Sequence, residues 1–215
     1  MVGVDLCDGF TLAVTDAGAV FSFGHSEYGK LGHGSLEQNK VLPRQIQPLA
    51  QTGRRFVAVA TGNRHALALT EEGELYGWGQ MFANGHGSDA HTPRPVAALI
   101  GERVKLVAAG DDASCAVTEK GELFTWGEWS GQYNLGHGVG RLHATPKRVQ
   151  ALVWVKVAAV AIGGLHSLAA DEDGVVWAFG NRNSLGLDHP NPGEPHFVKT
   201  PTPIPTLRVR ALKSL

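Results

Sequence analysis

Residues 65–79, with the sequence HALALTEEGELYGWG, decide the fold of this chain because their pattern occurs four times. A run of alternating character is followed by a short polar segment ending in Gly73, and a second such run ends in Trp78 and Gly79. Two such runs joined by a few polar residues and a glycine predict a β-hairpin, because the glycine supplies the left-handed backbone that closes the turn. The other copies are FTLAVTDAGAVFSFG (residues 10–24), ASCAVTEKGELFTWG (residues 113–127) and HSLAADEDGVVWAFG (residues 166–180).

Each hairpin is accompanied by two further segments that we predict to be strands. A proline-led step follows at Pro43, Pro93 and Pro146, and less clearly at residues 201–205. We expect this step at the edge of a sheet, where the missing N–H of proline costs nothing. A β-branched, alanine-rich run then leads into the next hairpin and is expected to be a buried strand. These runs are residues 55–62, 103–110 and 155–164.

Four short strands in a unit of about 52 residues, repeated four times, are typical of the blades of a β-propeller. No unit has a convincing 3.6-residue apolar period, which excludes helical solenoid repeats. The sequence therefore predicts an all-β chain that forms a single propeller domain, or a partial propeller, over residues 1–215. The repeats cover approximately residues 7–61, 62–109, 110–162 and 163–215.

The composition agrees with this fold and excludes several classes of protein. Glycine accounts for 28 of the 215 residues, charged residues for 18%, and the formal net charge is −1. Such a chain is not a disordered tail, and it lacks the basic charge that drives non-specific binding to nucleic acids. The most apolar run, residues 153–162, contains Lys156 and is too short to span a membrane as a helix.

The cysteines and the amino terminus suggest where the protein works. Cys7 and Cys115 lie far apart and form no disulfide framework, which favours a reducing compartment. The amino terminus has no basic region followed by an apolar stretch, so no signal peptide is visible. We therefore expect an intracellular protein of the cytoplasm or nucleus, with a cytoskeletal or ciliary location as an alternative.

The repeat resembles the regulator of chromosome condensation repeats. Residues 62–65 and 163–167 match the opening of that family's signature, and a Trp–Gly pair closes the hairpin in two units. The resemblance covers essentially the whole chain and implies a propeller that binds other proteins, in a family that includes the exchange factor for the GTPase Ran. The residues that carry the repeat signature are Gly18, Gly24, His65, Gly73, Trp78, Gly79, Gly121, Trp126, Gly127, His166, Gly174 and Gly180.

The chain departs from that family in the number of its blades. Rings of the family usually have seven blades, whereas this chain holds four, which either close a small ring or form part of a longer propeller. We favour the second alternative, in which residues 207–212 pair into a following blade. A proline-rich insertion, residues 188–205, is interpreted as either a docking segment or a stiff bypass loop.

The ten histidines do not predict a metal site. His65 and His166 share one repeat position that other residues fill in the remaining units, so packing and hydrogen bonding explain them better. The other histidines of the repeat lie between glycines in equivalent loops, one for each blade, and are expected to be spaced along the propeller instead of converging on one ion. They are His33, His86 and His137.

No motif predicts catalysis or a cofactor. Residues 171–174 resemble the start of a calcium loop, but their counterparts are plain hairpin turns and the downstream glutamate is missing. The chain has no nucleophile elbow, phosphate-binding loop or dinucleotide fingerprint. Cys115 lies within a predicted strand and is expected to be a buried structural thiol. We therefore expect no catalytic residues, no metal and no cofactor.

The loops after the Trp–Gly pairs are the best candidates for a functional surface, because equivalent loops of a propeller gather on one face. Loops held by a rigid scaffold commonly carry binding residues, and aromatic and arginine side chains dominate interfaces. We predict a non-enzymatic scaffold that binds a protein partner. The alternatives are a guanine-nucleotide exchange factor for a small GTPase and a structural subunit of a large ciliary or ribosome-associated assembly. The candidate residues are Tyr28, Phe82, Trp129, Tyr133 and Arg182.

Overall fold

The structure is a computed structural model, and it describes residues 3–34, 39–127, 133–187 and 196–209. Within these residues, sixteen strands form four antiparallel sheets, each of four strands in chain order. The first sheet contains β1 (Gly3–Cys7), β2 (Phe10–Val14), β3 (Val20–Gly24) and β4 (Lys40–Gln45), and the second β5 (Phe56–Thr61), β6 (His65–Thr70), β7 (Leu75–Gly79) and β8 (Ala90–Pro95). The third contains β9 (Val104–Ala109), β10 (Ala113–Thr118), β11 (Leu123–Gly127) and β12 (His143–Arg148), and the fourth β13 (Val157–Ile162), β14 (His166–Asp171), β15 (Val175–Asn181) and β16 (Phe197–Arg208).

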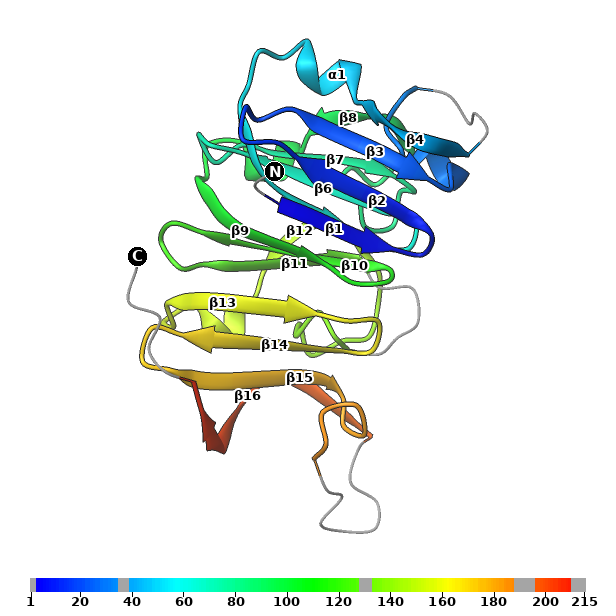
Figure 1. The fold of residues 1–215 in the computed structure, drawn as a ribbon. Helices are drawn as coiled ribbons and strands as arrows, with labels where there is room; N and C mark the ends of the chain where they lie inside the picture. Colours follow the sequence, from blue (N-terminus) through cyan, green and yellow to red (C-terminus); the bar gives the residue numbers. More distant parts are fainter. Residues whose placement is uncertain (1–2, 35–38, 128–132, 188–195, 210–215) are drawn as a thin grey trace.

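The four sheets are consecutive blades of a β-propeller, as the repeat predicts (Figure 1). The first strand of each blade packs beside the first strand of the next, in the order β1, β5, β9, β13. The sheets do not close into a ring, so the closed four-bladed alternative is not observed and the arrangement is a partial propeller. The helices of the described residues are single turns. The first, η1 (Glu27–Gly29), lies in the loop after β3, and the other three lead from one blade to the next: α1 (Gln47–Ala50), η2 (Ala97–Leu99) and η3 (Gln150–Leu152).

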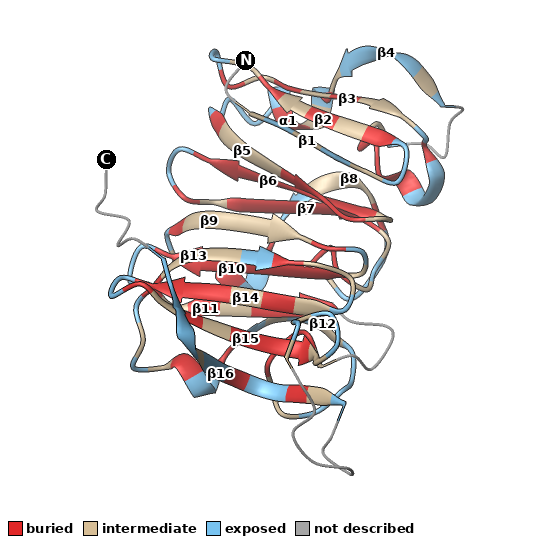
Figure 2. Ribbon diagram, turned by 60° about the horizontal axis from the view of Figure 1, so that its bottom comes forward, coloured by how far each residue is buried: buried red, intermediate tan, exposed pale blue. Residues whose placement is uncertain are grey.

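Apolar side chains between neighbouring sheets form the core. Three buried clusters lie at the three junctions between blades, and the residue before the closing glycine enters the cluster each time. Trp78, Trp126 and Phe179 are almost completely buried at these positions. Figure 2 shows that burial is concentrated in the middle strands of the later blades and falls toward the exposed outer strand β4. None of the helices in the described part of the chain is long and apolar enough to cross a membrane.

One backbone hydrogen bond joins each hairpin turn to the start of the next blade. The carbonyl of Gly73 accepts from Val104 N–H at 3.0 Å, and the carbonyl of Gly121 accepts from Val157 N–H at 2.9 Å. The turn after β14 repeats the contact, because Val209 N–H donates to Gly174 O at 3.0 Å. Val209 therefore takes the position at which the first strand begins in the other blades.

The structure corrects two predictions for the end of the chain. Residues 197–205 of the proline-rich insertion are not a bypass loop but part of β16, a strand of 12 residues that pairs with β15. The outer strand expected from the proline-led step at residues 201–205 is thereby confirmed. Leu207 and Arg208 end the same strand and do not begin a strand of a following blade. Prolines fit here because β16 is the outer strand, where one side needs no ladder hydrogen bonds. Residues 188–195 and 210–215 lie outside the described residues.

The strands place the connections on two opposite faces, seen on the right and left of Figure 1. We call one the loop face: it carries residues 25–34, 80–89, 133–142 and 181–187, together with the turns between the first and second strands of each blade. We call the other the turn face: it carries the hairpin turns between the second and third strands and the connections from one blade to the next.

Candidate protein-interaction site

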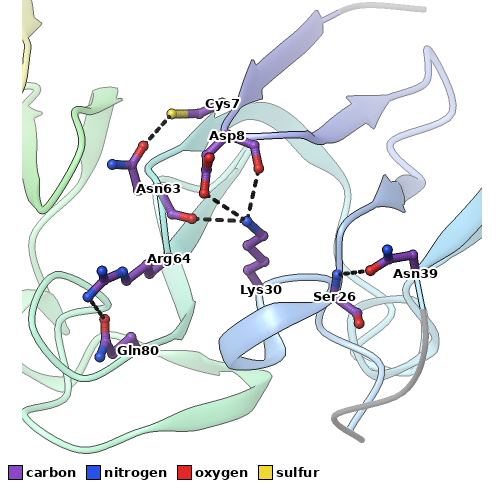
Figure 3. A network of polar contacts seen from close by, with 8 residues as sticks. All are labelled: Cys7, Asp8, Ser26, Lys30, Asn39, Asn63, Arg64 and Gln80. Atoms are coloured by element: carbon purple, nitrogen blue, oxygen red, sulfur yellow. Dashed lines mark hydrogen bonds and ion pairs between the residues drawn. The ribbon is translucent and has the colours of Figure 1, made fainter.

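A buried lysine organises the first junction on the loop face (Figure 3). The Lys30 side chain has no exposed surface, and its Nζ donates to the carbonyls of Asp8 at 3.0 Å and Asn63 at 3.1 Å. The Asp8 carboxylate lies 3.4 Å from the same atom, and the Phe10 ring centroid lies 5.0 Å from it. A buried ammonium is tolerated when its donors are used in this way. Lys30 thus fixes the loop after β3 to the second blade.

The same loop position is bound to the following blade at all three junctions. The indole N–H of Trp78 donates to Lys30 O at 2.8 Å, and that of Trp126 donates to Ala83 O at 2.8 Å. At the third junction the equivalent side chain is the ring of Phe179, which has no N–H. There the hydroxyl of Ser167 donates instead, from Oγ to Asn134 O at 2.7 Å. The loops are therefore anchored by the blade that comes after them.

One histidine position of the repeat stabilises the loops on the loop face. The rings of His33, His86 and His137 fold back onto the third strand of their own blades, where their Nε2 atoms lie 2.9–3.0 Å from oxygen atoms. Burial lowers the pKa of His137 to about 4 and also lowers the pKa of His86. Among the described residues, no three His, Cys, Asp or Glu side chains converge as metal ligands.

The cysteine thiols are held in their protonated form. Burial, followed by the nearby Asp111 carboxylate, raises the pKa of Cys7, whose thiol donates to Asn63 Oδ1 at 3.2 Å. Burial raises the pKa of Cys115 to about 12. A protonated thiol is a poor nucleophile. Both cysteines therefore contribute packing and hydrogen bonding at the junctions between blades.

The four predicted site residues that the structure describes lie on the loop face but make different contacts. Tyr28 is half-exposed and has the Arg64 guanidinium 5.0 Å from its ring centroid. Tyr133 packs against β16, with its ring 5.0 Å from the Phe197 ring and 5.2 Å from Lys199 Nζ. The remaining three are Phe82, which is partly buried, Arg182, whose backbone N–H donates to His196 O at 2.9 Å, and Trp129, which lies outside the described residues.

Comparison with known proteins identifies the repeat. The sequence profile of the regulator of chromosome condensation (RCC1) repeat matches residues 17–69, 72–117 and 120–170, which together make up more than half of the chain. The chain belongs to the RCC1 repeat family. A second profile with the same description matches residues 56–87, 104–133 and 157–186. The matches of the first profile start in the hairpin turns, two strands after each sheet begins, whereas those of the second profile start with the first strands β5, β9 and β13.

Relatives share these RCC1 repeats within longer proteins. The human E3 ubiquitin-protein ligase HERC2 is 38% identical over 177 residues, which are 80% of this chain and 4% of HERC2. The Ultraviolet-B receptor UVR8 of Arabidopsis thaliana is 35% identical over 177 residues, 80% of this chain and 39% of the receptor. The crystal structure of human WBSCR16 superposes with a TM-score of 0.81 at 26% identity, covering 94% of this chain and 54% of WBSCR16. The chain thus spans under two thirds of each.

Sequence reasoning missed four apolar side chains on the loop face of these RCC1 blades. Met81, Val139, Leu142 and Leu165 are all between 37% and 44% exposed, as is Tyr28. They are not aromatic and do not stand at signature positions, so no pattern in one sequence separates them from core residues. Their position beyond the strand ends, which the tertiary structure shows, distinguishes them.

Proposed function

We propose that this chain is a protein-interaction scaffold that binds its partner through the loop face. The observation that supports this proposal is the presence of exposed apolar side chains on loops that are fixed in place by neighbouring blades. Met81 and Leu165 are exposed on this face, and Tyr28 contributes an aromatic ring. Loops that are ordered before binding lose less conformational entropy when they bind. Exposed apolar and aromatic side chains surrounded by polar groups are typical of interface hot spots.

The polar groups near these loops serve to hold the scaffold together. Lys30, Ser114 and Asn134 use their side chains to bind backbone carbonyls of the same or neighbouring loops. Hydrogen-bonding groups committed in this way are not available for chemistry on a substrate. We therefore propose a non-enzymatic role for this chain. The ligase activity in the name of HERC2 is a property of HERC2 and is not assigned to this chain.

Quantitative affinity purification with matched variants tests the proposed surface. We expect the double variant Met81→Ser/Leu165→Ser to lose at least one partner that the wild-type chain retains, because both changes remove apolar area from the loop face. The control is Ile100→Ser, since Ile100 is more exposed than either but lies on the turn face. Retention of the same partners by the double variant, with unchanged circular dichroism, contradicts the proposal.

Three further measurements test the alternatives and the expected location. A nucleotide-release assay with Ran and other small GTPases tests the exchange-factor alternative, because a scaffold without exchange activity leaves the release rate unchanged. Native mass spectrometry of the species purified from cells tests the role as a subunit of a large assembly, because a free chain of 22.8 kDa contradicts it. Fluorescence microscopy of a tagged chain tests the expected cytoplasmic or nuclear location.

A further inference from the structure

The third junction on the turn face departs from the pattern of the first two. Arg55 Nη1 lies 3.2 Å from Glu71 Oε1 at the first junction, and Arg103 Nε lies 3.0 Å from Glu119 Oε1 at the second. Lys156 and Glu172 hold the equivalent positions at the third. Their backbones keep the shared contact, because Glu172 N–H donates to Lys156 O at 3.0 Å.

No ion pair joins these two side chains at that junction, in the part of the chain that the structure describes. Glu172 and its neighbour Asp173 are exposed carboxylates on the hairpin turn after β14. Asp171 is different, because its carboxylate accepts from the N–H groups of Asp173 and Val175 and from the Trp177 indole. Two carboxylates of this turn are therefore available to a cation from outside the blade.

A tryptophan stands beside these carboxylates at a position where the fold needs no side chain. Trp154 lies three residues before the first strand of its blade, the position that Gly53 and Gly101 hold at the other junctions. A Cβ at either glycine would meet no heavy atom within 4 Å, so the position faces open space. Trp154 is 95% exposed. Its large apolar area gains nothing from folding in this orientation.

Trp154 and the turn form the walls of a groove of about 310 Å³. Its lining includes Lys156 and the three carboxylates of residues 171–173, which gives one positive and three negative charges and a formal net charge of −2. An indole face attracts a cation, and arginine combines stacking on an aromatic ring with paired hydrogen bonds to carboxylates. The groove therefore has both components of an arginine-binding site.

We propose that this groove binds a peptide segment of a protein partner through an arginine. The arginine side chain stacks on the indole of Trp154, and its guanidinium pairs with Glu172 and Asp173. The partner thereby supplies the guanidinium that Arg55 and Arg103 supply within the chain at the first two junctions. This surface is on the turn face, so it is separate from the loop face and would let the scaffold bind two proteins at once.

Selection from a library of random dodecapeptides displayed on phage tests this proposal with the whole chain. The library is first depleted on the Trp154→Ala variant and then selected on the wild-type chain. We expect the recovered peptides to be enriched in arginine over lysine, because lysine lacks the planar group that stacks and forms paired hydrogen bonds. Failure to recover peptides that depend on Trp154, or recovery of peptides without arginine, overturns the proposal.

Fluorescence anisotropy of one recovered peptide then assigns the contacts. Trp154→Ala is expected to weaken binding by about 30-fold, the effect of a hot-spot residue, and Glu172→Gln/Asp173→Asn by about tenfold. Ile100→Ala on the turn face is the control and should bind like the wild type. Binding by Trp154→Ala within twofold of the wild type overturns the assignment. Circular dichroism checks that each variant is folded.

Discussion

The His65 Nε2 atom lies 2.7 Å from the hydroxyl oxygen of Ser114, which belongs to the next blade. Ser114 also donates its single hydroxyl proton to Ala83 O at 2.9 Å, so His65 must donate from Nε2. Three segments, from the second strand of one blade, the loop after its third strand and the second strand of the next blade, therefore meet in one chain of hydrogen bonds. His166 holds the same repeat position in the fourth blade, where it is only partly buried.

The buried imidazole of His65 should make stability sensitive to acid. Burial lowers its pKa from 6.5 to about 3, so the unfolded chain binds a proton at this residue more readily than the folded chain. Its contribution is then complete above pH 6.5 and is lost as the pH falls from 6.5 toward 3. The free energy of unfolding should fall by up to about 1.4 kcal/mol per pH unit in this window. Urea unfolding at several pH values measures this slope, and His65→Gln should make it shallower. Equal slopes in the two proteins contradict the prediction.

Removal of the hydroxyl at Ser114 should destabilise the junction between the second and third blades. Ser114→Ala leaves His65 and the Ala83 carbonyl without this partner in a buried place. The free energy of unfolding should fall by about 1–3 kcal/mol, the usual cost of an unsatisfied buried polar group. Chemical denaturation measures the change. Ser88→Ala is the control, because Ser88 is exposed on the loop face. Equal stability of both variants would show that the hydrogen bond is not needed.

The closing glycine of the hairpin should not accept a side chain. Gly79 has a φ of +98°, and a Cβ there would overlap the Arg64 carbonyl oxygen of the adjacent turn. Gly101→Ala is the matched control, because Gly101 has a similar φ of +91° but open space around it. Backbone strain of about 1–3 kcal/mol applies to both variants, and only Gly79→Ala also has the overlap. Thermal unfolding should therefore show a clearly larger loss for Gly79→Ala, and equal losses would rule out the steric cause.

The buried ammonium of Lys30 should be needed for the first junction. Lys30→Met keeps the length of the side chain but leaves the carbonyls of Asp8 and Asn63 without a donor. We expect a loss of about 1–3 kcal/mol in the free energy of unfolding. Lys147→Met serves as the control, because Lys147 is exposed on β12. Hydrogen exchange should also become faster in residues 25–34. Unchanged exchange there would mean that Lys30 does not fix the loop.

Much of the fold could be predicted from the sequence because the repeat is local. The four hairpins, the proline-led outer strands and the apolar first strands all appear in the structure where their residues indicate. The prolines of residues 197–205 indicate either a loop or an outer strand, and the chain forms the outer strand β16, which also includes Leu207 and Arg208, predicted to pair into a following blade. An outer strand tolerates prolines because only one of its sides is paired. Local composition therefore could not separate a loop from an edge strand.

The candidate site was predicted only in part. Equivalent loops after the third strands lie on one face, as the repeat implies, but the partners of Tyr28 and Tyr133 come from neighbouring blades. The exposure of Met81 and Leu165 and the burial of Lys30 are opposite to what their residue types suggest. Such differences depend on which blade packs against each residue.

The sequence by itself determined that the chain is built from propeller blades, because alternation and turn glycines specify each hairpin within about 15 consecutive residues. Only the tertiary structure decided which side chains remain accessible to a partner. Trp78 and Trp154 have the same chemistry, yet Trp78 is sealed between two blades and Trp154 stands in solvent. The physical reason is that burial is set by contacts between segments some fifty residues apart, which the local pattern of a repeat does not contain.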